Sequence, residues 1–300
     1  MTGLISKIQR YSTKDGPGLR STVFMIGCNL RCRWCANPEL IDPGPKILYH
    51  AHRCIGCGAC VAISGGAIRL GENGCVIDRE SCTNLEDCAA ACFYDAYESL
   101  GFEITAADLV EKLMRDKTFY DHSGGGVTFS GGEAAMQDRF VCETANLLRE
   151  RGVRVALDTA GLVSLEKLKS LADNVDLVLY DMKAFDDAIH RKYTGASNVL
   201  ILENARHLAD MGKSMIIRLI LIPGVNDQQS DLESRLKFVK SLGSTVQQVD
   251  ILKFHQLGAG KYICLGLPNL MEGASDCPDH AAEDAAALAR RIGLSVTVGG

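Results

Sequence analysis

The chain has 300 residues, of which 47% are hydrophobic and 23% charged, so it can bury a substantial core and extensive disorder is not expected. Its net charge is −5 and it contains no run of basic residues, which argues against nucleic acid as a partner. The N-terminus lacks an apolar signal core, and later apolar runs are far shorter than the ~20 residues of a membrane span. We therefore expect a soluble, cytoplasmic protein with no membrane partner.

Strands and helices alternate after residue 100. Strands rich in Val, Ile and Leu are expected at 22–26, 126–130, 153–159, 175–183, 215–223, 246–254 and 294–298. Amphipathic helices are expected at 104–120, 135–152, 164–173, 198–212, 231–243 and 281–293. Apolar strands that alternate with helices are typical of a parallel sheet, so the expected fold class is α/β. Roughly six β/α units favour a partial (β/α)6 barrel over a doubly wound sheet.

Residues 51–100 interrupt this pattern. They are rich in Cys, Gly and Ala and contain few long apolar runs, which predicts a small domain held together by metal and inserted into a barrel formed by 1–50 and 101–300. The chain has thirteen cysteines, and ten of them lie between residues 28 and 92. Without a secretion signal a disulfide framework is not expected, and clustered Cys-x-x-Cys spacing indicates metal binding.

The stretch CNLRCRWC places Cys28, Cys32 and Cys35 directly after the first predicted strand. This is the end of a strand at which barrel enzymes carry their chemistry. Thiolate metal sites usually have four protein ligands, and no fourth cysteine follows nearby. Three thiolates can hold three irons of a 4Fe–4S cluster and leave the fourth iron for a ligand that is not protein. A zinc knuckle or a buried group of thiols is the alternative interpretation of the spacing.

The spacing C-x3-C-x2-C resembles the signature of the radical S-adenosylmethionine superfamily. The resemblance implies that the amino and carboxylate groups of S-adenosylmethionine bind the open iron. It also implies that the reduced cluster supplies one electron, which cleaves the sulfonium to a 5′-deoxyadenosyl radical. The family has an aromatic residue near the adenine, and Trp34 stands at that position.

Further motifs of this superfamily follow at the ends of successive predicted strands. In SGGE the resemblance assigns Gly131, Gly132 and Glu133 to the amino end of the cofactor, although Ala134 replaces the usual proline. The other positions that it assigns to the cofactor site are Asp158, Asp181, Lys183, Arg218 and His255. In the relatives, two aspartates and a threonine bind a monovalent cation, which maps onto Asp158, Thr159 and Asp181. Alternatively, the two aspartates only cap the helices that follow.

Together, the segments YSTKDGPGLRSTVF, CANPE and GGGVTFSGGE resemble glycyl radical enzyme activating enzymes over essentially the whole chain. That family, which includes the pyruvate formate-lyase type, abstracts a hydrogen from one glycine Cα of a larger partner enzyme. The resemblance implies anaerobic chemistry and a flavodoxin or ferredoxin as electron donor. It places Asp15, Gly16 and Arg20 against the glycine loop of the partner, although DGPG by itself indicates only a tight turn. A radical enzyme acting on a small molecule and a ferredoxin-like electron carrier are the alternatives.

The insertion resembles a ferredoxin module, as in the longer activating enzymes. In such a module the fourth cysteine of each cysteine run binds the cluster of the other run. One auxiliary 4Fe–4S cluster is therefore expected on Cys54, Cys57, Cys60 and Cys92. Ser64 and Leu85 replace two cysteines of the other site, so only Cys82 and Cys88 remain there. Cys75, with Ser64 or water, offers a less favoured route to a second auxiliary cluster, and zinc is a further alternative.

Overall fold

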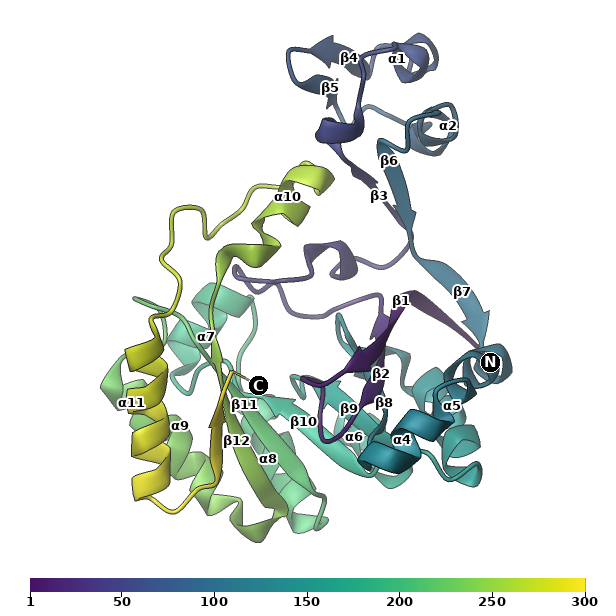
Figure 1. The fold of residues 1–300 in the computed structure, drawn as a ribbon. Coiled ribbons are helices and arrows are strands. Elements are labelled where there is room, and N and C mark those ends of the chain that lie inside the picture. Colours follow the sequence, from purple (N-terminus) through teal and green to yellow (C-terminus); the bar gives the residue numbers. More distant parts are fainter. Residues whose placement is uncertain (300) are drawn as a thin grey trace.

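The computed structural model describes residues 1–299, and its centre is a nine-stranded, mostly parallel sheet (Figure 1). The strand order is β13-β12-β11-β10-β9-β8-β2-β1-β7. The strands from β2 to β13 are parallel, whereas β1 and β7 pair in antiparallel fashion. Their bounds are β1 (Thr2–Ser12), β2 (Arg20–Met25), β7 (Phe102–Thr105), β8 (Gly126–Gly131), β9 (Arg154–Thr159), β10 (Leu177–Asp181), β11 (Met215–Leu221), β12 (Val246–Lys253) and β13 (Val296–Val298). The predicted α/β fold with a central parallel sheet is confirmed.

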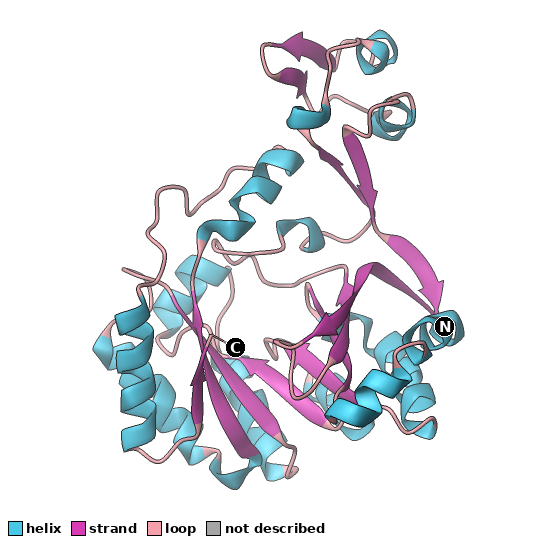
Figure 2. Ribbon diagram, viewed as in Figure 1, coloured by secondary structure: helices cyan, strands magenta, loops and turns pink. Residues whose placement is uncertain are grey.

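Helices pack on the outer face of this sheet, as Figure 2 shows. The α-helices outside the insertion are α3 (Ala106–Met114), α4 (Lys117–Ser123), α5 (Asp138–Glu150), α6 (Leu165–Asn174), α7 (Asp187–Thr194), α8 (Val199–Asp210), α9 (Gln229–Ser241), α10 (Ala259–Leu265) and α11 (Asp279–Arg291). Short 3-10 turns are η1 (Pro38–Leu40), η2 (Ala51–Arg53), η3 (Ala134–Gln137), η4 (Gly243–Thr245) and η5 (Gln256–Gly258). Ser164 caps α6 by accepting from the Lys167 amide at 3.5 Å, as its position before an amphipathic run predicts.

The two faces of the sheet are different in character because side chains alternate along each strand. On the outer face Phe129 and Leu157 are fully buried against the helices, and each such side chain stabilises the fold by about 1.5–3 kcal/mol. The inner face has a smaller apolar group, formed by Ala156, Leu177, Leu179 and Ile216. Two residues further along these strands, the same face carries Asp158, Asp181 and Arg218. The strands therefore place a polar layer above an apolar floor.

Several elements differ from the sequence prediction. Strand β1 was not predicted, because Lys7 and Arg10 make its sequence look like a polar N-terminal segment. The predicted helix at 104–120 divides into α3 and α4, and the break falls at Asp116, whose carboxylate binds Arg10 and accepts from the Ser21 hydroxyl at 2.9 Å. Helices α7 and α10 are only eight and seven residues long and gave no extended periodic pattern.

The insertion is a separate small unit joined to the sheet through β3 and β6 (Figure 1). It contains β3 (Lys46–Tyr49), α1 (Ala59–Ile63), β4 (Ile68–Gly71), β5 (Gly74–Ile77), α2 (Leu85–Ala90) and β6 (Tyr97–Leu100). Lys46 pairs with Leu100, so β3, which precedes the predicted start of the insertion at residue 51, lies beside β6. Arg79 attaches it to α10 by donating to the Cys264 carbonyl oxygen at 2.8 Å. Within residues 1–299, no helix combines the length and apolar character that crossing a membrane requires.

Candidate active site

The loop that carries Cys28, Cys32 and Cys35 leaves the end of β2 and is fixed by backbone hydrogen bonds from several elements. The amide of Cys28 donates to the Ile41 carbonyl at 2.7 Å, and the amides of Arg31 and Arg33 donate to the end of α7 at 2.8 and 2.9 Å. The Cys35 amide donates to the Cys32 carbonyl at 3.1 Å, which closes a turn between two of the cysteines. The three cysteines therefore lie on one ordered loop at the carboxyl end of the sheet.

Burial raises the pKa of all three thiols in this loop. The pKa of Cys28 rises to about 11 and that of Cys32 to about 12, and the pKa of Cys35 is also raised. The ammonium of Lys183 opposes this effect on each of them, because a nearby positive charge favours a thiolate. Three thiols in a partly buried loop beside one cation fit the thiolate ligands of an iron–sulfur cluster, which must lose their protons on binding.

The glycine pair of SGGE brings the end of β8 against the cysteine loop. A Cβ on Gly132 would collide with the carbonyl oxygens of Gly27 and Leu40, and a Cβ on Gly131 would collide with the backbone of Met25. Gly131 also has a φ of 110°, which favours glycine. The missing side chains thus allow two backbone segments to meet, a role that the sequence analysis did not foresee for them.

Gly132→Ala is expected to displace the start of the cysteine loop, at a cost of about 1–3 kcal/mol, and to lower the amount of iron bound per chain. Gly260→Ala is the matched control, because a Cβ there meets no atom within 4 Å. Iron and sulfide are measured after anaerobic assembly of both variants. Equal iron in Gly132→Ala and the unsubstituted protein would show that this close approach is unimportant.

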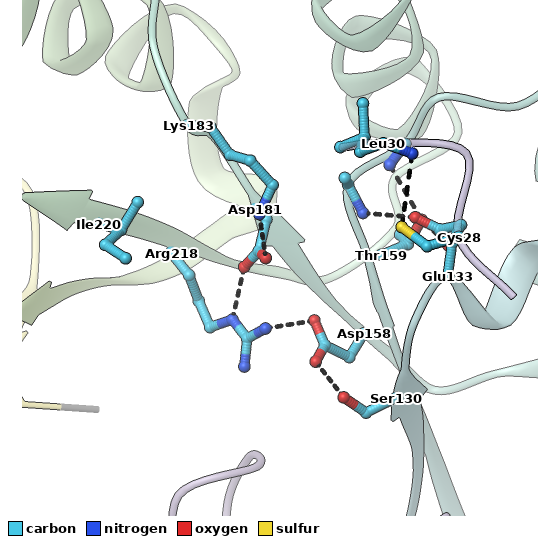
Figure 3. A network of polar contacts seen from close by, with 12 residues as sticks. Cys28, Leu30, Ser130, Glu133, Asp158, Thr159, Asp181, Lys183, Arg218 and Ile220 are labelled. Atoms are coloured by element: carbon cyan, nitrogen blue, oxygen red, sulfur yellow. Dashed lines mark hydrogen bonds and ion pairs between the residues drawn. The ribbon is translucent and has the colours of Figure 1, made fainter. Parts of the chain in front are cut away.

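Glu133 connects the loops that follow β8 and β9. Its buried carboxylate accepts from the Thr159 hydroxyl at 2.7 Å, the Ala160 amide at 2.9 Å and the Ala135 amide at 3.1 Å (Figure 3). Burial raises the pKa of Glu133 to about 7, although these three donors oppose the rise. The donors come from the segments that follow β8 and β9, so Glu133 holds these two segments together at the mouth of the site.

The raised pKa of Glu133 predicts a pH dependence of stability. The folded state holds this proton up to about pH 7 and the unfolded chain loses it near 4.5, so stability falls as the pH rises between these values. The free energy of unfolding should fall by on the order of 3 kcal/mol relative to Glu133→Gln, which does not titrate. Denaturant unfolding from about pH 5 to 8 measures this difference. Parallel curves for the two proteins would refute the prediction, and Glu150→Gln, on the surface of α5, is the control.

The polar layer on the inner face centres on Arg218 (Figure 3). Its guanidinium binds the Asp158 carboxylate and donates from Nε to Asp181 Oδ1 at 2.8 Å. Asp181 also binds the Lys183 ammonium at 3.0 Å, and Asp158 accepts from the Ser130 hydroxyl at 2.5 Å. Two carboxylates and two cations thus form one nearly buried network, which joins the ends of four neighbouring strands.

The pKa values of the two aspartates in this network are shifted in opposite directions. Burial is the largest influence on both. It raises the pKa of Asp158, for which Arg218 is the only cationic contact among the described residues. At Asp181 the two cations Arg218 and Lys183 outweigh burial and hold the pKa below its usual value. The difference follows from the second ion pair, which only Asp181 has.

The three residues expected to bind a monovalent cation do not form one oxygen cage here. Asp158 and Asp181 share the Arg218 guanidinium, whereas the Thr159 hydroxyl donates to Glu133 and accepts from the Gly161 amide at 2.9 Å. Among the described residues, no three His, Cys, Asp or Glu side chains are placed to hold a single metal ion. Arg218 supplies the positive charge between the aspartates that the sequence analysis assigned to a cation.

Trp34 and His255 line the same small pocket beside Cys35. The indole is buried and lies 6.2 Å from the ring of Tyr193, whereas His255 is exposed and accepts from the Leu257 amide at 3.3 Å. The structure therefore brings together two side chains that the sequence analysis assigned to the cofactor site.

Lys261 and Tyr262 end the segment FHQLGAGKY, residues 254–262, and no role was predicted for them. Tyr262 donates to the Cys35 carbonyl at 2.9 Å, and Lys261 donates to the Ala36 carbonyl at 3.0 Å and binds the buried Glu39 carboxylate at 2.6 Å. The segment therefore attaches α10 to the cysteine loop. Their position in the pattern FHxLGxxKY, which also contains His255, was the signal that could have identified these two residues.

The β1–β2 turn is fixed from within by the residues predicted to contact a partner. Arg20 is buried and donates to Thr128 Oγ1 at 2.6 Å and to the Val127 carbonyl at 2.7 Å. Asp15 accepts from the Thr22 hydroxyl at 2.6 Å, and Gly16 turns the chain with a φ of 112°. The charged groups of Asp15 and Arg20 thus hold the turn in place.

A pocket of about 320 Å³ lies between this turn and the inner face of the sheet. Its lining includes Lys14, Gly16, Ile216 and Asp250. Asp250 is the register partner of Arg218 on the neighbouring strand. The pocket therefore adjoins the polar network from the side of the β1–β2 turn.

Comparison with known proteins agrees with the arrangement of this site. The family model of the Radical SAM superfamily matches residues 22–238, so the chain belongs to this superfamily. It is 41% identical over 266 residues to the trans-4-hydroxy-L-proline dehydratase activating enzyme of Clostridioides difficile, and the match covers 87% of each chain. It is 34% identical over 306 residues to the benzylsuccinate synthase activating enzyme of Thauera aromatica, covering 99% of this chain and 92% of the relative. Within the superfamily, the chain is a member of the family that these activating enzymes form.

Solved structures show the same fold. A domain of a pyruvate-formate lyase-activating enzyme from Bacteroides vulgatus ATCC 8482 is 26% identical, with a TM-score of 0.51, and the match covers 59% of this chain and all of that one. QueE from Escherichia coli, at 13% identity, has a TM-score of 0.51 and covers 99% of this chain and 94% of its own. Membership of the activating-enzyme family, in contrast, favours an iron–sulfur cluster over zinc at the three cysteines and disfavours an electron carrier as the function.

Proposed function

We propose that this chain is an activating enzyme that generates the radical of a partner glycyl radical enzyme. It reductively cleaves S-adenosylmethionine and uses the 5′-deoxyadenosyl radical to abstract a hydrogen from one glycine Cα of the partner. The observation that carries the proposal is the combination of three partly buried cysteines on one ordered loop with family membership among activating enzymes over 87–99% of the chain.

The cysteine loop would hold the 4Fe–4S cluster through Cys28, Cys32 and Cys35. When bound, this cluster supplies the electron that cleaves the sulfonium. The Lys183 ammonium stabilises the three thiolates, and the SGGE and FHQLGAGKY segments hold the loop in position. Trp34 and His255 border the adenosyl side of the cofactor, and the backbone at Gly131 and Gly132 borders its amino end. A monovalent cation is not part of this proposal, because Arg218 lies between Asp158 and Asp181.

The pocket beside the β1–β2 turn is the proposed entry for the glycine segment of the partner. It adjoins the polar network, and its wall includes Gly16, which offers backbone without a side chain. Arg20 and Asp15 would act by holding this turn, since their polar groups bind Thr128 and Thr22. An extended glycine strand needs such a narrow, backbone-lined approach.

The open sheet would function as a partial barrel, with the inserted unit as a ferredoxin-like iron–sulfur domain. Six of the thirteen residues in the core of the insertion are cysteines, which is typical of a domain stabilised by a metal cluster as well as by apolar packing. It would carry one auxiliary 4Fe–4S cluster and accept electrons from a flavodoxin or ferredoxin. Its attachment to α10, which also holds the cysteine loop, gives it a direct connection to the barrel site.

Activation of a partner tests the proposal. Reduced, cluster-loaded protein is incubated anaerobically with S-adenosylmethionine and, separately, with the dehydratases, lyases and synthase that the relatives' names specify. The expected result is a doublet glycyl-radical signal in one partner and formation of 5′-deoxyadenosine in equal amount. Omission of S-adenosylmethionine is the control. Turnover of a small molecule in the absence of any partner, with no radical in any of them, would contradict the proposal.

A further inference from the structure

The cysteines of the insertion divide into two groups, and the division differs from the one that cysteine spacing predicts. The Sγ atom of Cys75 lies 3.6 Å from Sγ of Cys60 and 3.9 Å from Sγ of Cys54. Cys82 and Cys88 instead both approach the side-chain oxygen of Asn84, at 3.7 and 3.9 Å. Cys75 therefore belongs with the first cysteine run, and the idea that it completes a second cluster with Cys82 and Cys88 is not supported.

Ser64 does not complete that second site either. Its buried hydroxyl donates to the Val61 carbonyl at 3.0 Å and accepts from the Ile68 amide at 3.1 Å. These two bonds close the turn between α1 and β4, so the serine that replaces a cysteine has a structural use. The second site is left with two thiols.

Cys75 is held firmly in the first group. Its amide donates to the Tyr49 hydroxyl at 2.6 Å, and the preceding Gly74 allows that hydroxyl to approach, because a Cβ there would come within 2.5 Å of it. Cys75 is only 8% exposed, and on strand β5 it belongs to a packed cluster of side chains that includes Tyr49 and Tyr97. A buried thiol so fixed by the backbone is poorly placed for any role other than packing or ligation.

The cluster of side chains around Cys75 also contains a buried hydroxyl, that of Tyr97, without a hydrogen-bond partner within residues 1–299. The rings of Tyr49 and Tyr97 lie 5.1 Å apart, and the buried hydroxyl of Tyr97 has no hydrogen-bond partner among the described residues. A thiolate or a cluster sulfide is the kind of acceptor that this hydroxyl would satisfy. Among the described residues, neither the Cys92 sulfur nor the Cys57 sulfur contacts another thiol. Cys57 lies between Cys54 and Cys60 in the first run, whereas Cys92 follows α2 at the end of the second run.

We propose that Cys75 provides the fourth thiolate of the auxiliary 4Fe–4S cluster, with Cys54, Cys57 and Cys60, in place of Cys92. The inference rests on the proposed auxiliary cluster. The ligand set then comes from one cysteine run and the β4–β5 hairpin, and the second run contributes nothing to it. The distances of 3.6 and 3.9 Å from the Cys75 sulfur to those of Cys60 and Cys54 show that these three thiols lie next to one another.

Iron and acid-labile sulfide per chain test this assignment after anaerobic assembly. The unsubstituted protein should bind about eight irons, Cys75→Ser about four, and Cys92→Ser about eight. Cys82→Ser, in the same domain, is the matched control and should also bind about eight. Cys75→Ala serves as a second variant, and limited proteolysis within residues 46–100 shows whether the domain remains folded in each.

The outcomes separate the two proposals. About four irons in the unsubstituted protein would overturn the auxiliary cluster itself and this inference with it. About eight irons there, together with loss of four in Cys92→Ser or retention of eight in both Cys75 variants, would overturn the inference alone. Electron paramagnetic resonance of the fully reduced proteins provides a second readout, since loss of a cluster removes its signal.

Discussion

Cys32→Ser is expected to lose the barrel cluster and, with it, all formation of 5′-deoxyadenosine. Cys32 is the middle cysteine of the loop, it is partly buried, and its carbonyl closes the turn to Cys35. Serine preserves the size of the side chain and the backbone bonds, but its hydroxyl does not ionise near neutral pH to bind iron as a thiolate does. The bound iron should fall by about four per chain, which is one 4Fe–4S cluster.

Cys142→Ser is the control for this experiment. Cys142 lies on α5, where its thiol is 3.5 Å from the Ser170 hydroxyl, and it belongs neither to the cysteine loop after β2 nor to the insertion. Iron content, 5′-deoxyadenosine and the radical of the partner should all be unchanged in this variant. Continued cleavage of S-adenosylmethionine by Cys32→Ser would show that the three cysteines are not the site of this chemistry.

Arg218→Met is expected to lower the free energy of unfolding by about 3–5 kcal/mol. It removes the cation that binds both Asp158 and Asp181, and only Asp181 keeps an ion pair, with Lys183. The Arg218, Asp158 and Asp181 side chains are 13%, 11% and 22% exposed, so water cannot replace the lost ion pairs. The pKa of Asp158, already raised by burial, should rise further. Unfolding by urea, followed by circular dichroism in identically prepared cluster-free protein, measures the change.

A second substitution distinguishes loss of charge balance from loss of packing. Arg218→Met with Asp158→Asn removes one of the unbalanced carboxylates and should recover part of the lost stability. Arg191→Met breaks an exposed ion pair with Asp187 and should cost no more than about 1 kcal/mol. An effect of Arg218→Met no larger than that of Arg191→Met would show that the buried network is unimportant for stability.

The parts of the fold that the sequence predicts well are those with a strong periodic pattern. The strands β8 to β12 are apolar on both faces because helices cover one face and the sheet curves around the other, and this produces near-continuous runs of Val, Ile and Leu. Strand β1 was missed because Lys7 and Arg10 make its sequence look polar. It pairs with β2 from Ile5 to Ser12, and the pairing of Lys7 with Phe24 explains why this exposed segment is extended. Only its first residues, 2–5, pair with β7, which lies far away in the sequence.

The site residues could be located from the sequence, but their partners could not. Residues at the carboxyl ends of parallel strands must lie near one another, so Asp158, Asp181 and Arg218 were expected in one place. That Arg218 binds both aspartates depends on the register of three strands, in which Asp181 lies opposite Arg218. The sequence analysis therefore assigned the charge between the aspartates to a separate cation.

In the insertion, too, the sequence located the cysteines but not their neighbours in space. Spacing assigned Cys92 to the first cluster by analogy with repeated cysteine runs, and offered Cys75 only as a less favoured ligand of a second cluster with Cys82 and Cys88. The β4–β5 hairpin, in which Cys75 lies opposite Leu70, turns its thiol toward Cys54 and Cys60. A hairpin contact of this kind is set by three-dimensional packing, so the order of cysteines in the chain does not reveal it.

The central claim is that three cysteines of the β2 loop leave one iron free for S-adenosylmethionine. The most direct measurement is the electron paramagnetic resonance of the reduced cluster in a variant with Cys54→Ser and Cys57→Ser, so that only the barrel cluster contributes. Addition of S-adenosylmethionine labelled with ¹⁵N at its amino group should shift the signal and add hyperfine coupling to that nitrogen. A signal that is identical with and without the labelled compound would contradict the claim.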